Sequence, residues 1–207
     1  MKVLVACEVS GTVRDAFAKR GHDAWSCDIQ PRFTDIDKPD KRHLCLDVSH
    51  ILGENWDLVI AHPPCTYLCV TGNRWFKPEY ATRFPDRPKQ RERAINFFSE
   101  FTKLDWVEKV CIENPVGIMS RLYRKPDQII QPFQFGHKEA KKTCLWLKNL
   151  PPLKPTKIVE PEYTTYKSGK RMATWYADAI KLPKEERENL RSKTFQGIAD
   201  AMAEQWG

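Results

Sequence analysis

The sequence lacks any long apolar run. Its N-terminus has only a brief hydrophobic segment before Glu8, too short for a signal peptide, and no other segment approaches the roughly 20 residues of a membrane-spanning helix. The composition is typical of a globular chain, with 41% hydrophobic and 29% charged residues. These features predict a protein with no contact with a membrane.

The sequence also lacks paired CxxC motifs. Its seven cysteines are an odd number, and Cys65 and Cys69 are four residues apart, a pattern that predicts no metal site. Unpaired thiols are typical of a reducing cytoplasm. Four other cysteines lie in apolar, strand-like runs and are interpreted as small buried hydrophobic residues: Cys7, Cys27, Cys45 and Cys111.

Neither the GxGxxG fingerprint of dinucleotide-binding proteins nor the Walker phosphate-loop pattern occurs. A nucleoside can still lie across the ends of strands where a glycine allows close backbone approach and carboxylates accept from ribose and adenine. Gly11, Asp28 and Asp47 follow three successive apolar runs and could supply these groups in order. Because Asp is also common after strands, the pattern alone favours nucleoside binding and a plain structural role equally.

The chain carries an excess of positive charge. Its net charge of +7 and pI near 9.0 favour a polyanionic partner, although they do not locate the positive groups. At 207 residues the chain is large enough for one domain with a full core. We therefore expect a single domain over residues 1–207, with a loop-rich insertion over residues 150–193 before a closing C-terminal helix.

Short apolar segments alternate with helical patterns along the chain. This alternation predicts an α/β fold with a doubly wound, mostly parallel sheet. The last helix has the clearest periodicity, because its apolar residues form one stripe from Phe195 to Trp206. The other predicted helices cover residues 12–20 and 94–101, and the predicted strands cover residues 3–7, 23–28, 43–47, 58–61, 110–112 and 143–147.

The stretch over residues 57–67 is the most informative part of the sequence. Four apolar residues, 58–61, read as a strand buried on both faces, and two prolines then end it. Cys65 therefore lies just past the carboxyl end of a central strand, where ligands bind in open α/β sheets. It is either a buried structural thiol or a nucleophile, and a nucleophilic role requires a lowered pKa.

A second polar group follows the predicted strand over residues 110–112. Glu113 comes directly after this strand and before Asn114 and Pro115, so its carboxylate must face a cleft or a partner. A cysteine and a glutamate at the ends of neighbouring strands suggest covalent addition to an electrophilic ring. The acid would protonate, or hydrogen-bond to, a ring nitrogen.

Pro-Pro-Cys at residues 63–65 and Glu-Asn-Pro at residues 113–115, in this order on such a sheet, resemble the two catalytic motifs of the DNA cytosine-5 methyltransferases. The resemblance implies a Rossmann-like fold of the S-adenosylmethionine-dependent methyltransferase type. It implies that Cys65 attacks carbon 6 of a flipped-out cytosine while Glu113, with Asn114 beside it, engages ring nitrogen 3. Carbon 5 then takes the methyl group from S-adenosylmethionine.

The resemblance also implies a cofactor site. The segment around Gly11 resembles the family's first cofactor motif, and the final helix resembles the one that closes the cofactor pocket. Asp28 and Asp47 match the carboxylates that contact ribose and adenine. The residues so implied in S-adenosylmethionine binding are Glu8, Ser10, Gly11, Asp28, Asp47 and Pro63.

The sequence departs from the family in several places. Val13 and Arg14 stand where the first motif has its second glycine, and Thr66 stands where glutamine usually follows the cysteine. The Gln-x-Arg-x-Arg motif has only a weak counterpart, over residues 136–142. The resemblance covers residues 1–147 and 194–206 and leaves no room for a target-recognition domain, as in small phage-type members. This places the expected protein in the cytoplasm of a prokaryote or a phage-infected host cell.

Two segments combine basic and aromatic residues: 72–93, which follows Cys65, and 163–176. Each is either a solvated loop or hairpin or a surface for nucleic acid, since Lys and Arg can meet phosphates and aromatics can stack on bases. The residues predicted to contact double- or single-stranded DNA, or a cytosine nucleotide, are Arg74, Lys141, Lys142, Lys170 and Arg171.

The sequence therefore predicts a DNA (cytosine-5-)-methyltransferase, with two alternatives left open. The same chemistry could act on a free cytosine nucleotide or use a modified donor, as the missing recognition domain suggests. The altered cofactor and arginine motifs also leave open a non-catalytic nucleic-acid-binding or decoy protein on the same fold.

Overall fold

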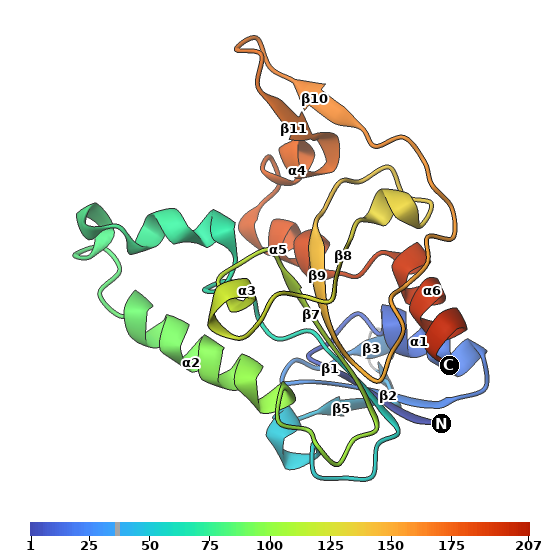
Figure 1. Cartoon of the computed structure of the whole chain (residues 1–207). Helices are drawn as coiled ribbons and strands as arrows, with labels where there is room; N and C mark the ends of the chain where they lie inside the picture. The colour runs from blue at the N-terminus through green and yellow to red at the C-terminus, as the bar shows by residue number, and fades with distance from the viewer. Residues whose placement is uncertain (36–37) are drawn as a thin grey trace.

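One sheet organises the chain. The computed structural model describes residues 1–35 and 38–207. Within this part, seven strands form a sheet in the order β5-β2-β1-β6-β7-β9-β8 (Figure 1). These strands are β1 (Lys2–Ala6), β2 (Asp23–Asp28), β5 (His43–Cys45), β6 (Leu58–Ala61), β7 (Lys109–Pro115), β8 (Gln128–Ile130) and β9 (Thr143–Lys148).

The strand directions confirm the predicted fold class. Neighbours from β5 to β7 are parallel, and β9 is antiparallel to both β7 and β8. Numbered by their order along the chain, the sheet strands run 3-2-1-4-5-7-6. The fold is thus a doubly wound, mostly parallel α/β fold of the Rossmann-like methyltransferase type. The carboxyl ends of β1, β2, β5, β6 and β7 meet at one edge of the sheet.

Helices and smaller elements flank the sheet. Two two-stranded ribbons pair β3 (Phe33–Asp35) with β4 (Lys38–Pro39), and β10 (Tyr163–Thr165) with β11 (Arg171–Ala173). The helices are α1 (Thr12–Lys19), α2 (Arg87–Phe101), α3 (Met119–Leu122), α4 (Thr174–Ala179), α5 (Lys184–Ser192) and α6 (Gln196–Trp206). Short 3₁₀ helices cover Val48–His50, Val70–Phe76, Pro78–Tyr80 and Pro132–Gln134. None of these helices has the length and apolar character needed to cross a membrane.

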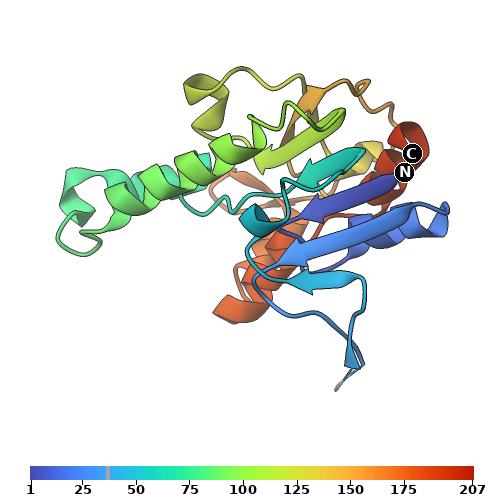
Figure 2. The ribbon, with the colours of Figure 1, turned by 90° about the horizontal axis from the view of Figure 1, so that it is seen from below.

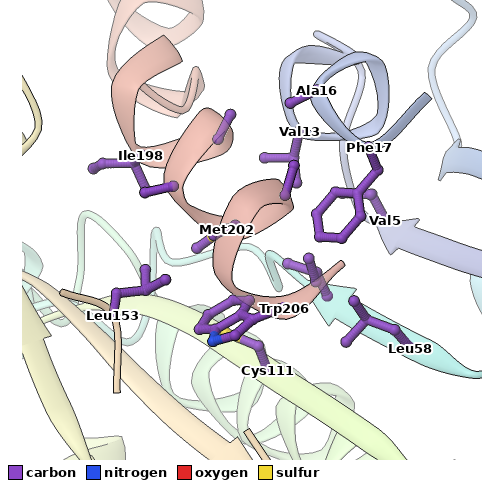
Figure 3. Close-up of a cluster of buried hydrophobic side chains, with 14 of the residues drawn as sticks. Val5, Val13, Ala16, Phe17, Leu58, Cys111, Leu153, Ile198, Met202 and Trp206 are labelled. Carbon is purple, nitrogen blue, oxygen red and sulfur yellow. The ribbon is translucent and has the colours of Figure 1, made fainter. Parts of the chain in front are cut away.

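Each face of the sheet has its own hydrophobic core, because alternate residues of a strand point to opposite faces. Val5 packs with α1 and α6 on one face, where Phe17, Met202 and Trp206 meet the strands (Figure 3). Its neighbour Leu4 packs on the other face, which α2 covers (Figure 2). Both cores lie below the carboxyl edge and hold the strand ends in place.

Most predicted elements are confirmed, and several need correction. β2 and β6 match their predicted bounds, and the other predicted strands match within a few residues. α2 begins at Arg87, so residues 87–93 of the supposed basic loop belong to an α-helix. β7 extends to Pro115, and β8 was missed because its three residues form too short a run. The segment over residues 150–193, expected to be loop-rich, contains β10, β11, α4 and α5.

Candidate active site

The loop after β6 carries the predicted nucleophile. Backbone N–H groups of Leu68 and Cys69 both donate to the carbonyl of Cys65, each at 3.0 Å, so this segment forms a single helical turn. One such turn brings side chains four residues apart to the same side. Cys65 is half-buried and Cys69 is buried. The turn therefore pairs the two thiols.

The two thiols share one negative charge more easily than either could carry it alone. Their mutual hydrogen bond, with a hydroxyl from Thr71 and the backbone N–H of Gly72, lowers the pKa of Cys69 to about 5 against the cost of burial. The Thr71 Oγ1 lies 3.1 Å from the Cys69 Sγ. The same hydrogen bond, and burial, raise the pKa of Cys65. Cys65 thus lacks the lowered pKa that a nucleophile needs, and its neighbour has it.

Glu113 lies within β7 rather than after it. The prediction placed it beyond the strand, but Glu113 and Asn114 still pair with Leu145 and Cys144 of β9. The carboxyl Oε2 lies 2.9 Å from Nδ1 of His62, the residue that follows β6. The carboxylate is thus held between the ends of two adjacent strands, on a rigid ladder rather than on a loop.

His62 and Glu113 form a largely buried pair at hydrogen-bond distance. Burial would lower the pKa of His62, but the hydrogen bond and charge of Glu113, helped by Glu8, outweigh it and raise that pKa. Burial alone would raise the pKa of Glu113, but the bond to His62 and the charge of Lys141 bring it below its usual range. Both pKa shifts therefore favour the charged forms of the pair, an ionised carboxylate beside a protonated imidazole. His62 was missed by the sequence reasoning, although it directly precedes the double proline.

Lys141 brings a positive charge to the same place. Its Nζ donates to the carbonyl of Arg191 at 2.8 Å, near the C-terminal end of α5, where a cation is favoured by the helix dipole. Its charge acts on Cys65, His62 and Glu113 alike, which places all four groups within electrostatic reach. Lys142, the next residue, is exposed.

Arg191 connects the segment after β9 to the thiols. Its charge contributes to the lowered pKa of Cys69, and its guanidinium lies over the Tyr176 ring at 5.1 Å. Nothing in the local sequence of α5 indicated this role, because the proximity arises only when residues 184–192 fold back toward the loop after β6.

Two further contacts fix the loop that carries Cys65. The buried Asn114 donates from Nδ2 to the carbonyl of Pro63 at 2.7 Å. Gly117 pairs with Cys69 in a backbone bridge, and a Cβ added at Gly117 would collide with the carbonyl of Leu68. The proximity of these chain segments requires glycine at this position. Asn114 and Pro63 thus act here as a brace between the two motif segments.

The residues implied in cofactor binding lie at the carboxyl edge, but several have other partners. Glu8 is buried and caps α1, accepting from the backbone N–H of Val13 at 2.8 Å and of Arg14 at 3.2 Å. Ser10 donates to Glu8 at 3.2 Å. Gly11 adopts a left-handed conformation, with φ of 64°, at the N-cap of α1. The turn therefore starts the helix without the glycine-rich pattern.

The space over Gly11 is filled by a side chain of this protein. A Cβ at Gly11 would collide with the guanidinium of Arg32. Arg32 is held there by Asp40 at 2.7 Å and Asp15 at 3.0 Å, and the buried Arg14 also binds Asp40, at 2.6 Å. Arg14, which stands where the family motif has glycine, thus helps to hold this network. A ligand that approaches the backbone at Gly11 must displace Arg32.

Asp28 and Asp47 differ in how many hydrogen bonds their carboxylates accept within the protein. Asp28 ends β2, is half-buried and accepts from the Gln30 backbone at 2.9 Å. Asp47 follows β5 and caps the next 3₁₀ helix, and bonds to the backbone and hydroxyl of Ser49 lower its pKa. Ile29, which follows Asp28, is 72% exposed, an unusual position for an isoleucine at a strand end. A carboxylate beside an exposed apolar side chain fits a ribose and its base.

Two hollows lie near these groups. An open one of about 610 Å³ is bordered by Ser10, Arg32 and Gln196, between α1 and the start of α6. A much smaller one is lined by Glu113, Lys141 and Phe195. Of the residues implied in cofactor binding, Ser10 borders the first hollow, and the implied catalytic acid, Glu113, borders the second. Among the described residues, no group of three or more His, Cys, Asp or Glu side chains could hold a metal ion.

The basic residues lie on two projecting parts of the chain. Segment 70–80, which contains Arg74, extends beyond the N-terminal end of α2 (Figures 1 and 2). Arg91 of α2 donates to the Tyr67 carbonyl at 2.9 Å and to Oδ1 of Asn73 at 2.7 Å, so this arginine ties the start of the segment to α2. Lys170 and Arg171 are exposed on the β10–β11 hairpin, which turns at Gly169 and extends away from the sheet (Figure 1).

The cysteine interpretations are correct in part. Cys27 and Cys111 are buried as expected, and Cys7 is half-buried with its pKa raised above the usual range by burial. Cys45 is exposed, because β5 is the edge strand and ends there. All seven cysteines are described, and each is free.

Comparison with known proteins assigns no family to the chain. No family model and no curated protein matches it. It is similar to the crystal structure of a candidate DNA modification methyltransferase encoded within a prophage (E. coli), with 16% identity and a TM-score of 0.47. The match covers 88% of this chain and 55% of that one, so this chain spans little more than half of that protein. The fold assignment therefore rests on the strand order and directions of this chain's own sheet.

Proposed function

We propose that this protein transfers a methyl group from S-adenosylmethionine to carbon 5 of cytosine in DNA, through a covalent adduct with Cys65. One observation carries the proposal. Cys65 and Glu113 come from the ends of adjacent strands, and the charge of Glu113 contributes to the raised pKa of Cys65, so the thiol and the acid lie within electrostatic reach of each other. A thiol and an acid that face the same pyrimidine are what addition across its 5,6 double bond requires.

The residues divide the chemistry as follows. Sγ of Cys65 bonds to carbon 6 of the ring, after its proton passes to the sulfur of Cys69. Glu113 engages ring nitrogen 3, which receives the electrons displaced from the ring. Carbon 5 becomes nucleophilic and takes the methyl group, and loss of its proton with release of Cys65 restores the aromatic ring and the thiol.

The cofactor supplies an electrophilic methyl group when bound. Asp28 would accept from the ribose hydroxyls, and the exposed Ile29 would cover one face of the adenine. Ser10 and Gly11 would meet the rest of the molecule beside the hollow at α1. Glu8 and Asp47 would act indirectly, because their carboxylates already cap a helix and a 3₁₀ turn.

DNA is the favoured substrate because of the charge and its placement. The net charge is +7, and exposed basic residues stand on the projecting hairpin and on segment 70–80. A base in a duplex must be flipped out to reach a thiol at a strand end, and cationic projections can hold the flanking phosphates meanwhile. Lys142 of the segment before β9 and Lys170 of the hairpin would make such contacts.

A second candidate function is ligand binding without turnover. Arg32 fills the approach to Gly11 and is held by two carboxylates, which favours a closed turn over an open cofactor site. In this case the protein would bind nucleic acid and perform no chemistry. The two functions differ in whether S-adenosylmethionine binds.

Transfer of a tritiated methyl group tests the proposal directly. The wild-type chain is incubated with labelled S-adenosylmethionine and either duplex DNA, single-stranded DNA or free deoxycytidine nucleotides. Label in 5-methylcytosine of the DNA supports the proposal, and label only in the nucleotide would move the activity to the small substrate. Cofactor binding with no transfer to any of them would favour the second candidate function.

The covalent step has its own test. DNA containing 5-fluorocytosine cannot complete elimination, because carbon 5 then carries no proton to lose. We expect the wild-type chain to stay attached to this DNA through the peptide that contains Cys65, as located by mass spectrometry. Cys65→Ser should bind S-adenosylmethionine as the wild type does and form no adduct. An adduct on another residue would contradict the assignment of Cys65.

A further inference from the structure

His62 is a buried titratable group whose role the proposed chemistry leaves unassigned. It follows β6, and its backbone N–H donates to the carbonyl of Ala6 at 2.9 Å, so its position is fixed by the sheet. Its ring and the Glu113 carboxylate are 11% and 18% exposed. Nδ1 is bonded to Glu113, whereas the buried Nε2 has no hydrogen-bond partner in the part of the chain that the structure describes.

The charged groups around His62 come from three elements. Glu113 approaches from β7, Glu8 from the turn after β1, and Lys141 from the segment before β9, while Cys65 belongs to the same loop. Two carboxylates thus oppose a single ammonium, and Glu113 is in direct contact. This arrangement favours a protonated imidazole despite its burial.

The same arrangement creates a difficulty for Glu113 as an acid. A carboxylate that accepts a hydrogen bond from an imidazolium is ionised and has no proton to give. Nitrogen 3 of the ring gains electrons when the Cys65 sulfur bonds to carbon 6, and it needs a proton at that moment. The proton must therefore come from a group in contact with Glu113, and His62 is the one at hydrogen-bond distance.

We propose that His62 is a positioning residue that holds the proton which Glu113 delivers to nitrogen 3 of the cytosine. As the sulfur–carbon bond forms, the proton on Nδ1 moves to Oε2 of Glu113, and the carboxyl proton moves to nitrogen 3. On elimination, nitrogen 3 returns its proton through Glu113 to His62, and the proton of carbon 5 leaves to solvent. The pair thus starts and ends each cycle with one proton. This inference rests on the proposed function.

If His62 had only a structural role, its second ring nitrogen, Nε2, should also have a hydrogen-bond partner. Most buried side-chain nitrogens have a hydrogen-bond partner in the protein or in ordered water. The Nε2 of His62 has no such fixed partner among the described residues. An imidazole anchored at one nitrogen only can lose and regain its proton without breaking a second bond.

The pH profile of His62→Gln separates proton supply from orientation. Glutamine can still donate to Glu113 but holds no transferable proton. In single-turnover methyl transfer to DNA, the wild type should lose activity as the pH rises through the raised pKa of His62. The variant should be slower by about 10²-fold near neutrality. Its optimum should move to lower pH, because Glu113 must then carry the proton itself, with DNA affinity unchanged.

A uniform loss of rate with an unshifted pH profile would overturn the proposal and leave the proposed function intact. No methyl transfer by the wild-type chain would instead overturn the proposed function. Histidine NMR of the chain alone gives a readout that needs no activity. His62 should titrate above its usual value in the wild type and lower in Glu113→Gln, and titration at or below the usual value in the wild type would overturn the proposal.

Discussion

At the scale of single residues, the site depends on where protons reside. The pKa of Cys65, the proposed nucleophile, is raised, while that of Cys69 is lowered by hydrogen bonds to Cys65, Thr71 and Gly72. The same division occurs between Glu113 and His62. In both pairs, one group would contact the substrate and a neighbour would govern its protonation.

Replacing Cys69 tests the first pair. Serine in Cys69→Ser keeps the size of the side chain but cannot accept a proton from Cys65 at neutral pH. Methyl transfer to DNA should fall by about 10²-fold, and the loss should shrink as the pH rises and Cys65 ionises on its own. Single-turnover rates over a pH series measure this. A rate equal to that of the wild type at every pH would contradict the role of Cys69.

Replacing Asn114 tests the brace between the two motif segments. In Asn114→Ala the carbonyl of Pro63 loses its donor inside the protein, which should lower the free energy of unfolding by about 1–3 kcal/mol. Urea denaturation measures the change. Asn73→Ala is the control, since this exposed side chain accepts a hydrogen bond from Arg91 at the surface and surface changes are usually within about 0.5 kcal/mol. Equal effects of the two variants would contradict a special role for Asn114.

At the scale of elements, the site needs the loop after β6 to lie against the segment after β7. Gly117 is where the two backbones come closest, through the bridge to Cys69 and the Ile118 N–H that donates to the Leu68 carbonyl at 2.9 Å. A side chain here would push the turn that holds both thiols away from the strand that holds Glu113.

Gly117→Ala tests this contact. We expect a loss of stability of about 1–3 kcal/mol from the forced separation and a larger loss of methyl transfer than of S-adenosylmethionine binding. Gly53→Ala is the matched control, because a Cβ there meets nothing within 4 Å. Thermal unfolding and the two functional assays are compared across both variants. A tolerated Gly117→Ala would mean that the two segments can move apart without consequence.

At the scale of the whole molecule, the buried ion pair makes stability depend on pH. The raised pKa of His62 gives a contribution that is fully present below its usual value of 6.5 and lost as the pH rises through the folded value. The lowered pKa of Glu113 gives a contribution present above its usual 4.5 and lost as the pH falls through the folded value. Both contributions are therefore greatest between pH 4.5 and 6.5.

The matched variant for this prediction removes both charges. The free energy of unfolding of the wild type minus that of the double variant His62→Gln, Glu113→Gln should peak in this window and decline on either side. Urea denaturation at several pH values measures it. The other ionisable groups are common to both chains, so a difference that does not vary with pH would contradict the ion pair.

The surface charge leads to a prediction about DNA affinity. If Lys170 of the hairpin meets a phosphate, Lys170→Ala should weaken binding to all sequences alike and reduce the slope of log affinity against log salt by about 1. Lys103→Ala is the control, since this exposed lysine precedes the amino end of β7, at the opposite edge of the sheet. Titration of labelled DNA at several salt concentrations measures both, and equal slopes in the wild type and Lys170→Ala would remove the hairpin from the interface.

The sequence by itself determined the central sheet of the molecule. Runs such as Leu58–Ala61 are apolar at every position, so they form strands buried on both faces, and the prolines after them stop the ladder. Since successive parallel strands end at one edge, the segments that begin with Cys65 and Glu113 had to meet there. The single-domain organisation over residues 1–207 stays a prediction.

Only the tertiary structure decided the antiparallel direction of β9, the contact of His62 with Glu113, the lowered pKa of Cys69 and the position of Arg32 over Gly11. His62 and Glu113 are 51 residues apart, and their protonation depends on burial and on partners from separate strands. Local periodicity encodes which face of a strand is apolar, because that depends on neighbours in sequence. The pKa of a side chain depends on neighbours in space, which the packed sheet alone brings together.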